Sequence, residues 1–205
     1  YDAFDFHIVF HAIHNFCVVE LSNFYLDIIK DRLYCERADS KLRRAAQTVM
    51  YTCLDVLTRL VAPILAFTSE EIWSFMPHDK SADRESVLFN EIPKDLGYPA
   101  DEALLAKWDR LYDVRVEVNK ALELKRTAKE IGSSLEAAVT LTCEGELYGF
   151  LKGMQEELAT LFIVSKVALI EGVGDTPSDL AGLSVQVAKA DGGKCERCWV
   201  YSDTV

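Results

Sequence analysis

The sequence predicts a mainly α-helical protein, with a helical bundle over residues 1–132 and a small α+β module over residues 133–190. Apolar residues recur at helical spacing as far as residue 129, whereas the alternation typical of strands begins only after Gly132. Two closely spaced cysteines then stand in the last segment, residues 191–205.

The bundle should begin with helices over residues 3–17 and 21–34, each with apolar side chains on one side and Ser22 as a candidate N-cap. Asp39 or Ser40 should cap a long third helix.

Prolines should mark the next boundaries. Pro63 should end or kink the third helix, because the residue before a proline avoids the α conformation. A short helix should follow over residues 68–76, with hydroxyls and acids in its first turn. Residues 77–100 contain three prolines and read as a surface connector inside the bundle. A fourth long helix should run over residues 101–129.

The α+β module should contain strands over residues 135–143, 163–170 and 183–190, with a helix over 144–158 between the first two.

Composition limits the classes of function. The net charge is -11, which argues against nonspecific nucleic-acid binding and therefore against a DNA-binding role. No apolar run reaches the ~20 residues needed to cross a bilayer, and the start of the chain has no basic signal-peptide region. The first four of the six cysteines have no ligand-like spacing, which fits a reducing cytoplasm. We expect a cytoplasmic protein without a membrane partner.

Cys195 and Cys198 follow two glycines and form a C-x-x-C pair, the spacing that directs two thiolates at one tetrahedral metal. Structural zinc usually takes four protein ligands, and no Cys or His follows Cys198. The sequence therefore predicts an incomplete zinc ribbon and a chain cut from a larger protein. Redox chemistry and two incidental thiols are the alternatives; a redox pair usually opens a helix, whereas this pair follows a predicted strand.

Basic residues of the fourth helix divide into two kinds. Lys120 lies near Glu117 and Glu123, which predicts a solvated ion pair. Arg126 and Lys129 are our candidate RNA contacts, although Lys129 can also simply complement the helix dipole.

A second basic cluster surrounds the junction between the second and third helices, where RNA contact and a solvated helix junction are both open. Its members are Lys30, Arg32, Arg37, Lys41, Arg43 and Arg44.

No catalytic residue is predicted. The chain lacks a glycine-rich phosphate loop, a G-x-S-x-G motif and an H-E-x-x-H motif.

Several stretches closely resemble the anticodon-binding region of bacterial isoleucyl-tRNA synthetases, and together they extend over essentially the whole chain. They are residues 15–17, 20–34, 44–48, 60–73, 129–137 and 195–199. The helical stretches are shared in weaker form with the valyl, leucyl and methionyl class I enzymes. The cysteine pair followed by Trp199 favours the isoleucine family.

This resemblance implies a helical domain that binds the anticodon stem and loop of isoleucine tRNA. It also implies a monomeric parent enzyme that charges this tRNA using ATP and Mg²⁺ and removes mischarged valine, since one methylene gives too little discrimination by binding alone. The catalytic and editing domains would belong to the same parent chain. Cys195 and Cys198 would hold zinc with a second cysteine pair beyond Val205. Arg197 and Trp199 lie in the matched motif and would contact RNA.

Two other classes remain open. One is a stand-alone helical module that binds protein through a zinc knuckle. The other is a redox protein that uses Cys195 and Cys198.

Overall fold

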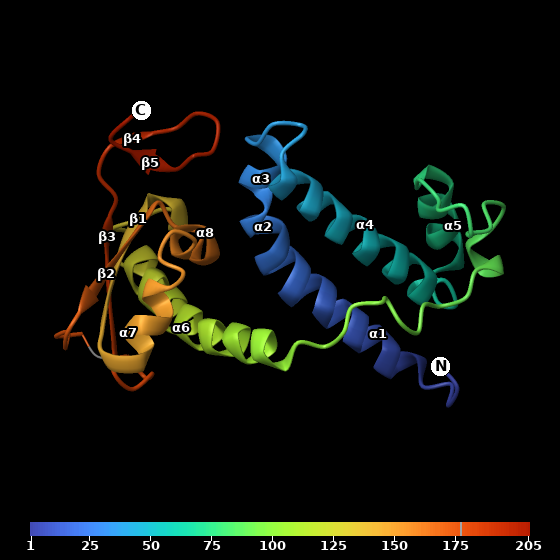
Figure 1. Cartoon of the computed structure of the whole chain (residues 1–205), viewed down its shortest axis with the longest axis horizontal. Coiled ribbons are helices and arrows are strands. Elements are labelled where there is room, and N and C mark those ends of the chain that lie inside the picture. Colours follow the sequence, from blue (N-terminus) through green and yellow to red (C-terminus); the bar gives the residue numbers. More distant parts are fainter. Residues whose placement is uncertain (177) are drawn as a thin grey trace. The chain divides into compact units, whose positions relative to one another are not determined.

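The computed structural model describes residues 1–176 and 178–205 (Figure 1). About half of them are helical, and a small mixed sheet accounts for most of the strands. The chain divides into two compact units, Tyr1–Pro99 and Ala100–Val205, each of which is described by itself.

The first unit begins with one nearly continuous helical segment in place of the two helices expected. Ser22 lies inside the π-helical part, so its prediction as an N-cap is wrong. The stretch contains no proline or glycine, so nothing ends the helix there. Its parts are α1 (Phe6–Asn15), η1 (Phe16–Tyr25), α2 (Leu26–Ile28) and α3 (Lys30–Tyr34).

The third predicted helix is α4 (Lys41–Val61), which ends before Pro63 as expected. Ser40 occupies its N-cap position, but its side chain makes no capping hydrogen bond. The next helix, α5 (Ala66–Phe75), begins two residues earlier than predicted, with Leu65 at its N-cap. The Leu65 N–H donates to the Val61 carbonyl at 2.7 Å, so the turn leads directly into α5 without a hydroxyl cap.

Trp73 belongs to a buried hydrophobic cluster of the first unit, where it packs with Ala62, Met76 and Val87. Its indole N–H donates to the Asp83 carbonyl at 3.1 Å. The connector is therefore partly folded onto the helices. Val87, which lies in the predicted surface connector, begins the 3₁₀ turn η2 (Val87–Phe89) and is buried.

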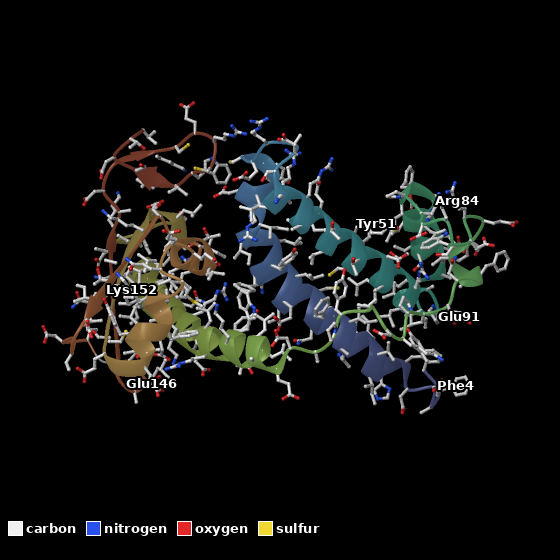
Figure 2. The ribbon with its side chains drawn as sticks, in the orientation of Figure 1. Phe4, Tyr51, Arg84, Glu91, Glu146 and Lys152 are labelled. Carbon is white, nitrogen blue, oxygen red and sulfur yellow. The ribbon has the colours of Figure 1, made fainter. Side chains whose placement is uncertain are left out.

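The connector is also held by a hydrogen bond from the third predicted helix. Tyr51 of α4, labelled in Figure 2, donates its hydroxyl to the Pro77 carbonyl at 2.8 Å.

The second unit begins with α6 (Glu102–Thr127), close to the predicted bounds of 101–129. Asp101 caps this helix, and its side chain accepts the Leu104 N–H at 3.0 Å. Its buried side chains include Val114 and Val118, and the helix packs against β3 and α8 of the sheet module. By these contacts α6 lies in the second compact unit, while the predicted helical bundle extends to residue 132.

The sheet of the second unit has the order β2-β1-β3. The central strand β1 pairs in parallel with β2 and antiparallel with β3, and Val139 faces both Val167 and Val187. A parallel pair needs a crossover connection, which α7 and α8 provide; the single helix expected there is divided near Gly153. The elements are β1 (Ala137–Cys143), α7 (Gly145–Lys152), α8 (Leu158–Phe162), β2 (Lys166–Glu171) and β3 (Leu183–Lys189).

A short hairpin of β4 (Gly193–Lys194) and β5 (Tyr201–Ser202) follows the sheet. It carries the two closely spaced cysteines, and no zinc ribbon is formed by the residues described. Within this part of the chain, no helix has the length and apolar character required to span a membrane.

Candidate nucleic-acid interface

The hairpin loop brings the two knuckle cysteines into one tight turn. The Cys195 N–H donates to the Val200 carbonyl and the Trp199 N–H donates to the Cys195 carbonyl, both at 2.9 Å. Trp199 takes a left-handed conformation with φ of 65°, which closes the turn. Cys198 therefore lies within the same turn that Cys195 begins.

Gly192 is required at the base of this hairpin. Its φ is 99°, and an added Cβ would lie 2.4 Å from the Ser202 carbonyl carbon, too close for any side chain. The Gly-Gly sequence before the cysteines thus serves a close approach of two backbones.

The surroundings of the Cys195 thiol favour its deprotonated form. Its pKa is lowered, first by the backbone N–H of Cys198 and then by that of Arg197, with further contributions from the Cys198 side chain and the Arg197 charge. The thiolate is the form that binds metal. Over residues 1–176 and 178–205, however, no group of three or more His, Cys, Asp or Glu side chains could hold an ion. Two thiols are half of the four protein ligands that structural zinc usually takes.

Beside the cysteines, the hairpin presents one aromatic ring and two cations. The Trp199 side chain is 60% exposed. The Lys194 Nζ lies 5.4 Å from its ring centroid, and Arg197 is exposed in the same turn. An exposed ring can stack on an unpaired base while neighbouring cations contact phosphates. Lys194 was not predicted as an RNA contact, although its position directly before Cys195 could have indicated this role.

The other two candidate contacts lie at the C-terminal end of α6. Arg126 is exposed and pairs with Glu123. Lys129 has a left-handed φ of 59° and is exposed. Its N–H donates to the Arg126 carbonyl and the Glu130 N–H to the Lys125 carbonyl, both at 3.0 Å. These two bonds form a Schellman motif, in which glycine is the usual residue at the left-handed position.

Lys120 forms the predicted ion pair with Glu117, but its second partner is Asp179 and not the expected Glu123. Its Nζ lies 2.7 Å from Glu117 Oε1 and 2.7 Å from Asp179 Oδ2. The Asp179 N–H donates to the second oxygen of the buried Glu117 at 3.0 Å. Hydrogen bonds to Lys120 lower the pKa of Asp179, and the bond to Asp179 leads the contributions that raise the pKa of Lys120. No local sequence signal connects residues 59 positions apart.

The second basic cluster is mostly engaged within its own helix junction. Lys30 pairs with Asp27 and Arg37 with Asp39, and the Arg43 guanidinium donates to the Glu36 carbonyl at 3.2 Å. Local pairing supports the solvated-junction interpretation for these cations.

A family model described as the anticodon-binding domain of tRNA ligase matches residues 1–141, which include the whole first unit and α6. The chain belongs to this family of anticodon-binding domains.

Its relatives include isoleucine–tRNA ligases that align with the whole chain. The protein from Desulforamulus reducens is 51% identical over 212 residues, covering 100% of this chain and 22% of the relative. Those from Syntrophotalea carbinolica and Geobacter sulfurreducens are 49% and 46% identical over 208 residues, with the same coverage. The chain therefore spans about a fifth of the length of these relatives.

Proposed function

We propose that this chain is the tRNA-binding part of an isoleucine–tRNA ligase and that its terminal hairpin contacts the anticodon loop. The observation that carries the proposal is the exposed Trp199 beside Lys194 and Arg197, in a chain of the anticodon-binding family. Whole-chain similarity to isoleucine–tRNA ligases supports the choice of isoleucine tRNA as the partner.

In this proposal the aromatic ring of the hairpin and the cations of the hairpin and of the end of α6 contact different groups of the RNA. Trp199 stacks on an unpaired base of the loop, an interaction worth about 1–3 kcal/mol. Arg126, Lys129 and Arg197 contact phosphates, which position the RNA without reading its sequence. The acidic net charge of the chain confines this contact to local basic sites.

The remaining steps of the ligase reaction lie outside this chain. Charging of the tRNA with ATP and Mg²⁺, and removal of mischarged valine, belong to the part of the relatives' length that the chain does not span. The catalytic domain of the same parent chain is then a second partner. We place the parent enzyme in the cytoplasm as a monomer.

We also propose that Cys195 and Cys198 supply two ligands of a structural zinc site. The lowered pKa of Cys195 and the placement of both thiols in one turn support this role. The other two ligands would come from residues outside this chain. Zinc would supply a rigid cross-link at the hairpin, because a completed four-ligand site adds directly to folding stability.

Direct binding to isoleucine tRNA and to an unrelated tRNA across a salt series tests the RNA proposal. We expect tighter binding to isoleucine tRNA. The slope of log affinity against log salt concentration should steepen by about 0.7–0.9 for each phosphate contact. Trp199→Ala should weaken binding by about 5- to 150-fold. Tyr98→Ala, which removes an aromatic side chain that is 69% exposed in the first unit, is the matched control and should bind normally. Absence of binding, equal affinity for both tRNAs, or normal binding by Trp199→Ala contradicts the proposal.

Cobalt titration tests the metal proposal independently of RNA. Co²⁺ should give a thiolate-to-metal absorption band with this chain, and Cys198→Ser should remove most of it. Cys143→Ser, which changes a buried cysteine of the sheet, should leave the band unchanged. A band that survives the loss of Cys198 would rule out the knuckle as the ligand pair.

A further inference from the structure

One hydroxyl group joins the terminal hairpin to the sheet module. Ser165 lies between α8 and β2, and its Oγ accepts the Tyr201 N–H at 2.7 Å. The same hydroxyl donates to the Leu135 carbonyl. The Ser165 hydroxyl thus accepts a hydrogen bond from the hairpin and donates one to the segment just before β1.

The backbone around Ser165 is itself fixed. Its N–H donates to the Ala137 carbonyl at 3.1 Å, at the first residue of β1. Nearby, the Ala190 N–H donates to the Glu136 carbonyl at 2.7 Å, where the chain leaves β3 for the hairpin. The segment that enters the hairpin and the Ser165 anchor are therefore attached at the same end of the sheet, beside the start of β1.

The returning strand of the hairpin depends on this anchor. Tyr201 begins β5 and pairs with Lys194 across the hairpin, but its N–H is directed to Ser165. Two residues earlier, Trp199 is held by its bond to Cys195. A change in direction at Tyr201 would consequently move the whole Cys195–Trp199 turn.

We propose that Ser165 is a positioning residue for RNA recognition: its hydroxyl fixes the orientation in which the hairpin presents Trp199 and Arg197. The proposal rests on the proposed function of the hairpin as the anticodon-loop contact. Ser165 itself touches no RNA in this account.

Ser165→Ala tests the anchor. It removes the acceptor of the Tyr201 N–H, and a lost hydrogen bond at a half-buried site should speed amide exchange of Tyr201 by about 5- to 20-fold. We expect affinity for isoleucine tRNA to fall by about 3- to 10-fold in the same variant. Ser165→Thr keeps the hydroxyl and should restore both values toward those of the wild type.

Ser178→Ala is the matched control. The Ser178 hydroxyl also bonds to backbone carbonyls, those of Leu180 and Leu183, within the loop before β3. This variant should leave Tyr201 exchange and RNA affinity unchanged, with a melting temperature similar to that of Ser165→Ala.

The outcomes separate the two proposals. Unchanged Tyr201 exchange in Ser165→Ala would show that the anchor does not operate. Faster exchange with unchanged RNA affinity, in a chain where Trp199→Ala does weaken binding, would overturn the positioning role alone. If Trp199→Ala also binds RNA normally, the proposed function of the hairpin fails.

Discussion

Lys129 offers a test in which stability and RNA affinity should change in opposite directions. It occupies the left-handed position that ends α6, with φ of 59°. A non-glycine residue pays roughly 1–2 kcal/mol for this conformation. Glycine removes that cost but gives the unfolded chain more freedom, worth about 0.4–1 kcal/mol.

Lys129→Gly should therefore be more stable than Lys129→Ala by about 0.5–1 kcal/mol. For a unit of about this size, that difference corresponds to roughly 2–8 °C in melting temperature. Both variants lose the same charge, so both should weaken RNA binding equally and reduce the salt slope by about one phosphate contact.

Thermal unfolding followed by circular dichroism, together with RNA titrations at several salt concentrations, measures both effects. Equal stability of the glycine and alanine variants would refute the left-handed conformation. Different RNA affinities in the two variants would show that backbone flexibility, and not the lost ammonium group, determines binding.

Two further changes follow from the structure. Gly192→Ala should disrupt the hairpin, because its Cβ would lie 2.4 Å from the Ser202 carbonyl carbon; loss of the Tyr201 amide protection checks this, and a protected amide would contradict it. Lys120→Met should remove the stabilisation that the ion pair between Lys120 and Asp179 provides. The pair lowers the pKa of Asp179 and raises that of Lys120. Its contribution to stability is therefore lost below the ordinary pKa of 3.8 for Asp179 and above the ordinary pKa of 10.5 for Lys120. Urea unfolding against pH should show the difference from wild type at neutral pH and its decline at both extremes; a difference independent of pH would exclude the ion pair as its cause.

The sequence predicted the elements of this chain better than their packing. Helical periodicity located α6 to within two residues at each end, because apolar spacing is a local signal. The contacts of α6 with β3 were not predicted, since this packing is decided by residues far along the chain. The prediction of Ser22 as an N-cap was wrong because it relied on residue type alone. A residue that favours caps can lie inside a helix where no proline or glycine interrupts it.

The candidate site was also predicted in part. The glycines and cysteines of the knuckle carry their geometry in their spacing, and the structure places Cys195 and Cys198 in one turn. Ser165 and Asp179 gave no signal, because their partners are 36 and 59 residues away. Whether Arg126, Lys129, Arg197 and Trp199 meet RNA stays a prediction.

Nuclease footprinting of isoleucine tRNA bound to this chain tests the central claim most directly. The account predicts protection confined to the anticodon stem and loop, with the loop protection lost when Trp199 is replaced by alanine. Protection of the acceptor arm, or a loop footprint unchanged in Trp199→Ala, would contradict it.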